Sequence, residues 1–321
     1  MEHDIVVGID VAKLKFDAAV WLGETKYKTK VFANTPKGFE LLSAWLKPYQ
    51  SAHLCMEATG SYFVALATFL YESGWTVSVV NPFQIHSFGK SELIRNKTDQ
   101  VDSRLIARFC ASHKPPSWQP APLNERQLLA LIRRLDGLRE MRQIELNRLD
   151  VADNIIKPSI FEMIEALAQQ IHETEKKIKK HIDAAPELRQ RKALLTSIPG
   201  IGDVLSATLI GYLGDMSQFS HSGKVVAFAG LNPYQKESGK WQGQSHISKR
   251  GCANLRKALY MPALTAMTFN PVVKSLRDRM LARGQKGKVV VCAAMRKLLQ
   301  IAYGVLKSGL PFDEKIPLAK A

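Results

Sequence analysis

The order of strand-like and helix-like segments in the first 82 residues constrains this chain most. Five apolar runs have the length and residue types of β-strands, at residues 4–10, 16–22, 27–33, 53–60 and 75–82. Apolar residues at helical spacing fill the two gaps, at residues 38–49 and 61–74. Three early strands followed by alternating helices and strands predict an α/β domain with a mixed sheet and helices on both faces.

This first domain is expected to end in a helix and a proline-rich linker. A helix is predicted over residues 98–113, with Thr98 as its N-cap and Asp99 in its first turn. Residues 114–122 contain four prolines in nine positions and cannot form the interior of a helix. We therefore expect the first domain to span residues 1–121.

The periodicity changes after the linker. Apolar residues follow helical seams on both sides of Pro158, at Leu128, Leu131, Leu135 and Leu138, and then from Ile160 through Ile164, Leu167, Ile171, Thr174 and Ile178 to Ile182. This pattern predicts a hairpin of two long helices with a partly coiled-coil seam over residues 122–185. The hairpin either packs on its own domain or mediates self-association, and the sequence leaves both open.

Charge is concentrated in the last part of the chain. The formal net charge is +16, and residues 186–321 contribute 21 Lys and Arg against 7 Asp and Glu, or +14. This segment is predicted to be a mainly α-helical domain, with helices around residues 252–268, 272–283 and 289–307. A basic domain of this kind usually binds a polyanion, and nucleic acid is the expected partner.

The sequence favours a cytoplasmic protein. No run approaches 18 uninterrupted apolar residues, so no membrane span is expected. The N-terminus MEHDIVVGID is acidic and leads directly into a strand, which is unlike a signal peptide. Four scattered cysteines without CxxC spacing are typical of reduced cytosolic thiols.

Four carboxylates of the first domain occupy informative positions. Asp10 ends the first strand, Glu57 ends the fourth, and Asp99 and Asp102 lie three residues apart on one face of the last helix. Oxygen ligands suit Mg²⁺ or Mn²⁺, and clustered carboxylates repel each other unless cations are bound. Each acid taken alone is equally compatible with a surface charge or a helix cap.

The motifs around these acids resemble a known family. GIDVAK (8–13), CMEATG (55–60) and RNKTDQVDSRLIA (95–107) resemble the Asp-Glu-Asp-Asp set of RuvC-like nucleases with the RNase H fold. Their form is similar to that of the DEDD transposases of the bacterial insertion-sequence family numbered one hundred and ten. SIPGIG (197–202) and residues 227–263 resemble the C-terminal transposase domain of that family. The resemblance covers nearly the whole chain and implies that Asp10, Glu57, Asp99 and Asp102 hold catalytic Mg²⁺, with Mn²⁺ as a substitute.

A loop serine gains a role only through this resemblance. On the residues alone, Ser238, Ser245 and Ser248 are comparable loop hydroxyls, and an exposed serine without function is the simpler interpretation. In the resembled family the domain carries a nucleophilic serine in a Ser-Gly motif. The resemblance therefore implies that Ser238 forms a transient phosphoserine link to one DNA strand, which conserves bond energy without ATP.

Several residues are candidates for contacts with nucleic acid. The turn at Gly200 and Gly202 exposes backbone N–H groups at a helix N-terminus, a geometry that binds phosphate, although a plain tight turn is equally compatible. Basic side chains lie beside the serine loop and around the next helix, at Lys236, Lys240, Lys249, Arg250, Arg256 and Lys257. Such groups mostly contact phosphate. Trp241 either stacks on a base or packs in the protein.

The chain shows no convincing helix-turn-helix, zinc finger or basic zipper that would read DNA. In the resembled family, a noncoding bridge RNA pairs with target and donor DNA, so base pairing supplies the specificity. The expected partners are donor and target duplexes, a bridge RNA and further copies of the chain in a dimer or tetramer, in the bacterial cytoplasm at the nucleoid.

Two other functions remain open at this stage. The first is a metal-dependent, structure-specific nuclease of the Holliday-junction-resolvase kind, which uses water as the nucleophile. The second is a non-enzymatic nucleic-acid-binding protein in which the four acids are incidental.

Overall fold

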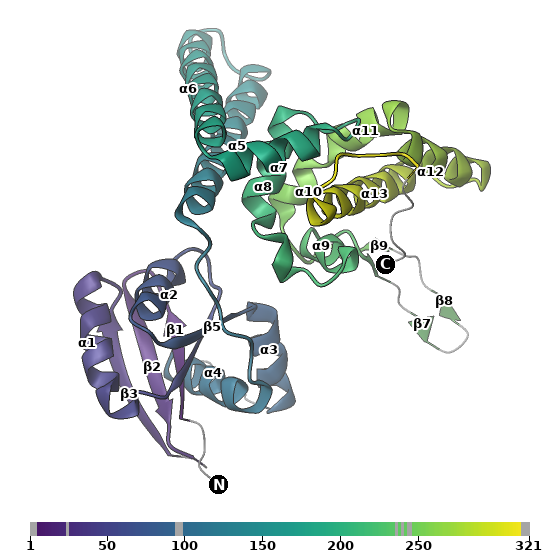
Figure 1. The fold of residues 1–321 in the computed structure, drawn as a ribbon. Helices are drawn as coiled ribbons and strands as arrows, with labels where there is room; N and C mark the ends of the chain where they lie inside the picture. The colour runs from purple at the N-terminus through teal and green to yellow at the C-terminus, as the bar shows by residue number, and fades with distance from the viewer. Residues whose placement is uncertain are drawn as a thin grey trace. The chain divides into compact units, whose positions relative to one another are not determined.

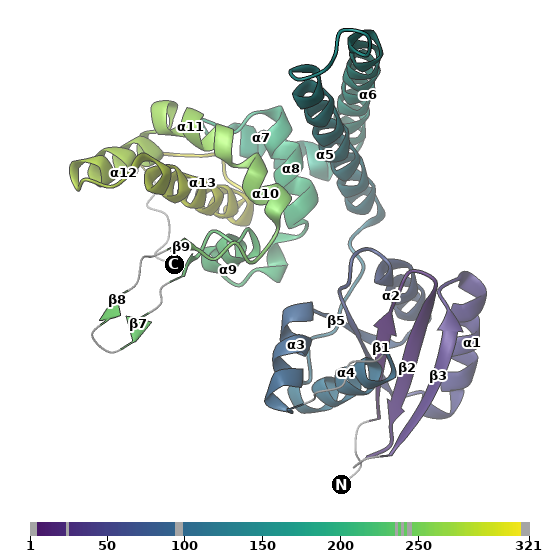
Figure 2. The ribbon, with the colours of Figure 1, turned by 180° about the vertical axis from the view of Figure 1, so that it is seen from behind.

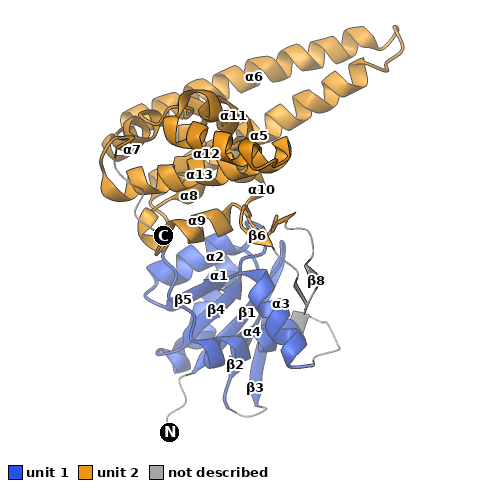
Figure 3. Cartoon of the chain, turned by 90° about the vertical axis from the view of Figure 1, so that its right-hand side faces the viewer, with its two compact units in different colours: residues 1–120 blue, residues 121–321 orange. Residues whose placement is uncertain are grey.

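The chain divides into two compact units. The computed structural model describes residues 5–23, 26–93, 99–234, 237–238, 241–242 and 246–315. Unit 1 comprises Met1–Pro120 and unit 2 comprises Ala121–Ala321, shown in different colours in Figure 3. The helical hairpin expected as a separate segment belongs to unit 2 in this division.

Unit 1 is built on a mixed five-stranded sheet (Figure 1). Its strands are β1 (Val6–Val11), β2 (Lys15–Trp21), β3 (Tyr27–Ala33), β4 (His53–Glu57) and β5 (Thr76–Val80). The strand order is β3-β2-β1-β4-β5; β1 pairs antiparallel with β2 and parallel with β4. All five predicted strands are confirmed, and so is the RNase H-like fold implied by the resemblance.

Helices cover both faces of this sheet. One face packs on α1 (Pro36–Leu46) and α2 (Phe63–Glu72), where Ile9 and Met56 join a core with Leu42 and Leu66. A short 3₁₀ helix (Lys47–Tyr49) follows α1. The opposite face packs on α3 (Pro82–Ser91) and α4 (Asp99–His113), where Val6 lies against Ile106. Because side chains alternate along a strand, the residues of β1 at even positions face α4.

Helix α3 was not expected from the sequence, because Pro82 was interpreted only as the end of a strand. Its start carries a recognisable signal, since Asn81 accepts a hydrogen bond from the backbone N–H of Phe83 (2.9 Å) and Pro82 occupies the first turn. An Asn-Pro pair after an apolar run can therefore begin a helix as well as end a strand.

The proline-rich segment is tied to the edge strand β5. Ser78 Oγ donates to the carbonyl oxygen of Pro116 (2.7 Å), and the N–H of Trp118 donates to the carbonyl oxygen of Val77 (2.6 Å). These hydrogen bonds hold residues 116–118 against β5, close to the end of unit 1 at Pro120.

Unit 2 begins with the predicted helical hairpin, α5 (Leu123–Leu149) and α6 (Lys157–Ala184). Five predicted seam residues of α6 are buried, namely Ile164, Leu167, Thr174, Ile178 and Ile182. Leu128 and Leu135 of α5 and Ile178 and Ile182 of α6 also join the main core of unit 2. The base of the hairpin is therefore part of the unit's core, while its tip projects away from the other helices of the unit (Figures 1 and 2).

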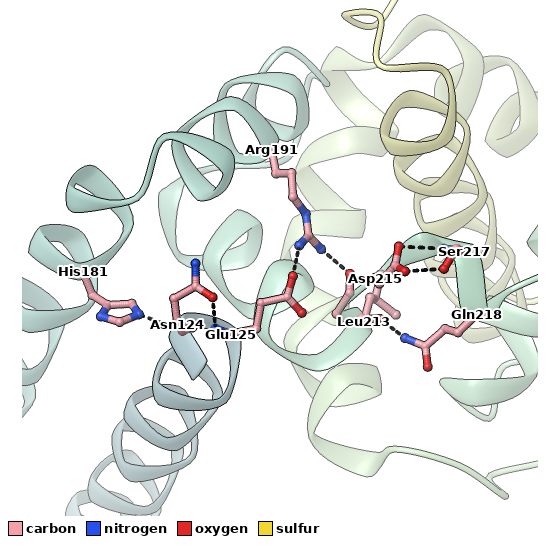
Figure 4. Close-up of polar contacts among 9 residues, drawn as sticks. Asn124, Glu125, His181, Arg191, Leu213, Asp215, Ser217 and Gln218 are labelled. Carbon is pink, nitrogen blue, oxygen red and sulfur yellow. Dashed lines mark hydrogen bonds and ion pairs between the residues drawn. The ribbon is translucent and has the colours of Figure 1, made fainter. Parts of the chain in front are cut away.

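Polar contacts fix the base of the hairpin to the next two helices, α7 (Pro186–Thr196) and α8 (Asp203–Leu213). Arg191 of α7 pairs with Glu125 Oε1 (2.7 Å) and also donates to the carbonyl oxygen of Gly214 (Figure 4). His181 Nε2 donates to the carbonyl oxygen of Asn124 (2.7 Å). The first turn of α5 is thus held by α6, by α7 and by the end of α8.

The rest of unit 2 is mainly helical, as predicted. Its helices are a 3₁₀ turn (Met216–Gln218), α9 (Ser222–Phe228), α10 (Ala253–Ala258), α11 (Tyr260–Phe269), α12 (Pro271–Ala282) and α13 (Gly287–Ser308). The helices expected around residues 252–268, 272–283 and 289–307 are confirmed, with the first divided into α10 and α11. Helix α9 was not expected within its Gly- and Ser-rich surroundings.

Helix α13 is the one helix of the described residues that is long and apolar enough to span a membrane. It has ten buried residues and lies in the main core of unit 2, and core helices of soluble proteins pass the same test. All four cysteines are free thiols, in agreement with the sequence prediction.

Candidate active site and nucleic-acid interface

Asp10 and Glu57 lie side by side at one edge of the sheet. Ile9 pairs with Met56 in the parallel register of β1 and β4, so the next residue on each strand is one of the two acids. Both face α4, because Ile9 and Met56 belong to the core on the opposite face. Neighbouring strands are about 4.8 Å apart, so the two half-buried carboxylates are near neighbours at the carboxyl ends of their strands.

A third carboxylate, Asp17, joins this edge. It pairs directly with Asp10 in the antiparallel register of β1 and β2, and directly opposed residues share a face. Its exposed fraction is only 8%, and its Oδ2 lies 3.2 Å from Lys15 Nζ. Sequence analysis did not single out Asp17, although an acid inside the apolar strand FDAAVWL is a usable signal.

Helix α4 reaches the same edge because Gly8 lets it approach the sheet. A Cβ atom on Gly8 would lie 2.0 Å from the carbonyl oxygen of Ser103 and 2.3 Å from the N atom of Ala107. Further along α4, Cys110 Sγ lies 4.0 Å from the carbonyl oxygen of His53, the first residue of β4. The C-terminal half of α4 therefore lies over the start of β4, and its first turns point toward the carboxyl ends of β1 and β4.

Those first turns carry the remaining two predicted acids. Asp102 is half-buried and precedes Ser103, the residue that contacts Gly8. The backbone of Asp99 begins α4, and its side chain lies outside the described part of the chain. The fold thus brings Asp10 and Glu57 together and directs the start of α4 toward them.

The donor chemistry of this edge fits a divalent cation. Its carboxylates supply the oxygen ligands that Mg²⁺ prefers, and Glu57 Oε1 is held by Thr59 Oγ1 at 2.9 Å. Among the described side chains, no group of three or more His, Cys, Asp or Glu residues is arranged to hold a metal ion. Asp10, Glu57 and Asp102 therefore do not form such a group by themselves, and the side chain of Asp99, the fourth ligand that the resemblance implies, lies outside the described residues.

The backbone of Ser238 lies in a nested β-hairpin of unit 2. The outer strands β6 (Pro233–Tyr234) and β9 (His246–Ile247) pair with each other, and so do the inner strands β7 (Glu237–Ser238) and β8 (Trp241–Gln242). Ser238 pairs with Trp241 in the inner ladder. Of the other predicted residues here, Lys236, Lys240 and Ser245 lie outside the described residues, as does the side chain of Trp241.

We call residues 231–248, which include Ser238, the serine loop, and the segments on either side of it its neck. Arg256 holds the two sides of the neck together. Its Nη1 donates to the carbonyl oxygen of Ala229 before the loop (2.9 Å) and approaches that of Lys249 after it (3.4 Å). Gly230 and Gly251 make the neck narrow, because a Cβ on Gly251 would lie 2.4 Å from the carbonyl oxygen of Phe228. Arg256, predicted to contact nucleic acid, therefore donates within the protein, and we infer that its main role is to hold the loop.

The other predicted basic residues of this region are at the surface. Lys249 and Arg250 are exposed, and the Arg250 guanidinium lies 5.8 Å from the ring centre of Tyr234. Lys257 is exposed and pairs with Glu140 of the hairpin (3.2 Å). Lys249 and Arg250 are thus accessible to phosphate beside the loop.

The two glycines of the SIPGIG turn differ in their surroundings. Gly200 has φ +102°, and a Cβ there would lie 2.9 Å from Ala266 Cα, so close packing on α11 requires glycine. Gly202 is the exposed N-cap of α8, with nothing within 4 Å of a Cβ position. Asp203 follows it and pairs with Lys192 (2.9 Å). Of the two glycines, Gly202 is the one whose backbone is exposed.

A chain of polar side chains, half-buried at Tyr212 and Asp136 and exposed at Asn254, connects α10 to the hairpin. Asn254 Nδ2 donates to Tyr212 Oη (2.9 Å), and that hydroxyl donates to Asp136 Oδ2 (3.0 Å). Burial raises the pKa of Tyr212 to about 12 and also raises the pKa of Asp136 above its ordinary value. The helix that carries Arg256 is therefore held on α8 and α5.

Comparisons with known proteins agree with this architecture. Residues 192–277 match the family model described as "Transposase IS116/IS110/IS902 family", and residues 7–152 match the model of the DEDD transposases of IS110. The pilin gene-inverting protein of Moraxella bovis is 35% identical over 316 residues, which cover 97% of this chain and 98% of that protein. The chain belongs to the IS110 family of transposases. It is therefore an enzyme that cuts and rejoins DNA.

Other relatives of this transposase are more distant. The transposase of insertion sequence IS1328 from Yersinia enterocolitica is 28% identical over 292 residues, covering 79% of this chain and 83% of that protein. Among solved structures, Thermus thermophilus RuvC is similar over 35% of this chain and 98% of that chain, at 15% identity and a TM-score of 0.27.

Proposed function

We propose that this transposase cuts and rejoins donor and target DNA through a transient covalent link to Ser238, assisted by Mg²⁺ at the DEDD edge and guided by a bridge RNA. The observation that carries the proposal is that Asp10 and Glu57 directly follow the paired residues Ile9 and Met56 on adjacent parallel strands, which places the two acids side by side. The close approach of α4 at Gly8 adds the helix that bears Asp99 and Asp102.

The acids of unit 1 have one common role in this proposal. Asp10, Glu57, Asp99 and Asp102 would hold Mg²⁺, for which Mn²⁺ can substitute, and Asp17 would add negative charge beside Asp10. When bound, the cation stabilises charge on the phosphate oxygens and activates an oxygen nucleophile. The carboxylates themselves fix where a phosphate backbone can approach the sheet.

The serine loop has the second role. Ser238 Oγ attacks phosphorus, an O–P bond forms, and the bond from phosphorus to a deoxyribose oxygen breaks, with the serine proton passing to that oxygen. The reverse reaction with the other strand's hydroxyl rejoins DNA and frees Ser238. Lys236 and Lys240 beside Ser238, and the exposed Lys249 and Arg250, would bind the flanking phosphates.

Positive charge supports the nucleic-acid partners. Residues 186–321 carry a net charge of +14, which suits two duplexes and an RNA bound together. Gly202 and Lys257 would add phosphate contacts. We place the transposase in the bacterial cytoplasm with the nucleoid, as a dimer or tetramer.

Trapping of the covalent intermediate tests the proposal. Wild-type protein, Ser238→Ala and the matched loop variant Ser248→Ala are incubated with labelled DNA, the transcribed flanking RNA and Mg²⁺, then run on a denaturing gel. We expect an adduct with wild type and Ser248→Ala and none with Ser238→Ala. Equal cleavage by Ser238→Ala without any adduct would instead identify a nuclease that uses water.

A second arm tests the metal edge. Asp10→Asn and Glu57→Gln are expected to lose strand cleavage, while wild type loses it in EDTA and regains it with Mg²⁺ or Mn²⁺. Full cleavage by wild type in EDTA would refute the metal site. Omission of the RNA tests guidance, because an unguided enzyme would recombine the same sites without it.

A further inference from the structure

The tip of the α5–α6 hairpin carries an unusual apolar patch. The exposed fractions of Val151 and Ile155 are 87% and 86%, and that of Ile156 is 50%. Single exposed aliphatic residues are common on soluble proteins, but three within six positions of one loop form a patch that commonly marks an interaction surface.

Acidic residues flank this patch. Asp150 and Asp153 are both exposed, and Asp153 Oδ1 accepts a hydrogen bond from the backbone N–H of Ile155 (3.0 Å). The cation of the loop is Lys157, whose Nζ donates to Asn154 Oδ1 (2.8 Å). Residues 149–157 therefore combine three exposed aliphatic side chains with a net charge of −1. We call this segment the hairpin tip.

The base of the same hairpin contains a cavity with the opposite character. It has a volume of about 270 Å³ and lies between α5, α6, α7 and α8. Its walls are aliphatic, with Ile132, Leu135, Ile178, Ile182 and Ala207. No described Phe, Tyr or Trp side chain lines it, and its polar lining includes His172. Its chemistry fits branched aliphatic side chains.

The rim of the cavity carries unpaired positive charge. Two rim acids are already paired, Glu175 with Arg139 (2.7 Å) and Asp203 with Lys192 (2.9 Å). The rim residues Lys176 and Lys179 are exposed and make no ion pair within the described parts of the chain. The rim therefore complements an acidic partner that has an aliphatic centre.

We propose that the hairpin tip of one copy of the transposase docks into the base cavity of a second copy. Ile155 and Val151 fill the aliphatic cavity, and Asp150 and Asp153 pair with Lys176 and Lys179. A tip cannot fill the cavity of its own chain, because cavity residues start at position 172 of α6, fifteen residues from Lys157. At 1.5 Å per residue, a continuous helix keeps them about 20 Å or more from the tip.

Reciprocal docking closes the assembly. Two hairpins related by a two-fold axis and lying antiparallel place each tip at the other's base, so both contacts form at once. This arrangement also covers Met141 and Ile144, which lie one turn apart on the same face of α5 and are each 50% exposed. The inference deepens the proposed self-association and needs no assumption about catalysis.

Charge reversal with a matched control tests the contact. Sedimentation velocity of the full chain over a concentration series, at 150 mM salt and without nucleic acid, gives the dimer dissociation constant. We expect Lys176→Glu with Lys179→Glu to raise it at least tenfold, and Asp150→Lys with Asp153→Lys to do the same. The control Lys177→Glu with Lys180→Glu makes the same charge change at exposed positions of α6 outside the cavity and should leave it within twofold. An equimolar mixture of the two reversed proteins should form heterodimers again.

Site-specific crosslinking gives an independent readout. Ile155→Cys and Val204→Cys proteins are mixed and treated with a short bismaleimide; Val204 is half exposed at the cavity. We expect a crosslinked dimer from the mixture and none above the wild-type background from either variant alone. A strictly monomeric wild type, no heterodimer after charge exchange, or equal crosslinking of Ile155→Cys alone would overturn the inference. A dimer unaffected by the tip and rim variants would overturn this contact while leaving self-association intact.

Discussion

Substitution of Gly8 by alanine tests how the DEDD edge is assembled. The added Cβ would lie 2.0 Å from the carbonyl oxygen of Ser103, which is 1.4 Å short of the 3.4 Å where ordinary contact begins. The obstructing atoms are helix backbone and cannot rotate away. Strand β1 is paired on both sides, so α4 must move.

The magnitude follows from these contacts. Overpacking in a closely packed interior costs about 1–3 kcal/mol. Loss of glycine's unfolded-state entropy offsets about 0.4–1 kcal/mol of this. We therefore expect a net loss of about 1.3 kcal/mol, which lowers the melting temperature of a unit of this size by about 5 °C.

The expected loss of activity is larger than the loss of stability. A shift of α4 by about 1 Å moves the turn that carries Asp99 and Asp102 away from Asp10, and such misplacement can cost about a hundredfold in rate. Calorimetry and Mg²⁺-dependent cleavage at a temperature where Gly8→Ala remains folded separate the two effects.

Gly137 provides the control for this experiment. It lies inside α5 with nothing within 4 Å of a Cβ position, so Gly137→Ala should stabilise by up to about 1 kcal/mol through helix propensity. If Gly8→Ala melts and cleaves like wild type, α4 does not press on β1, and the account of the edge is wrong.

Three further predictions address other parts of the transposase. Asp17→Asn should raise the Mg²⁺ concentration for half-maximal cleavage at least threefold, while Glu40→Gln, on exposed α1 surface, should not; an unchanged titration would remove Asp17 from the site. In Arg256→Met the carbonyl oxygen of Ala229 loses its donor, so amide exchange in residues 246–252 should become faster by a factor that corresponds to about 1–2 kcal/mol. Formation of the Ser238 adduct should also decrease, and Arg256→Lys should recover part of both effects. Unchanged exchange would show that the ends of the serine loop are held without Arg256. Burial raises the pKa of Asp136, so the folded state binds this proton more tightly than the unfolded chain, and that stabilising contribution is lost as pH rises through the folded pKa. Asp136→Asn should therefore gain stability relative to wild type as pH rises from 4 to 7, and a parallel pH profile in denaturant unfolding would contradict the assignment.

The sequence predicted most of unit 1 because its signals are local. Alternating and continuous apolar runs define all five strands. The ends of the first and fourth of these strands locate Asp10 and Glu57. Asp17 was missed because its proximity to Asp10 depends on the antiparallel register of β1 and β2, which spacing alone does not determine. Helix α3 was missed because Pro82 both ends a strand and begins a helix.

Unit 2 was harder to predict because its important contacts join distant segments. Arginine in a basic segment is typical of phosphate binding, yet the guanidinium of Arg256 donates to carbonyl groups on both sides of the serine loop. Packing of Gly200 against Ala266, 66 residues further along the chain, gives this glycine a structural role that the local turn pattern does not reveal. The base cavity draws residues from four helices, and no local pattern in the sequence indicates it.

The position of α4 also bears on when the enzyme becomes active during its synthesis. The sheet is complete once β5 has been made, but two of the four proposed metal ligands arrive with α4, and the segment through Trp118 then binds β5. A nascent or truncated chain that ends before α4 would possess the strands and lack half of the ligand set. Translation products that end before α4 would therefore lack the complete metal site proposed above and be unable to nick the chromosome of the host cell.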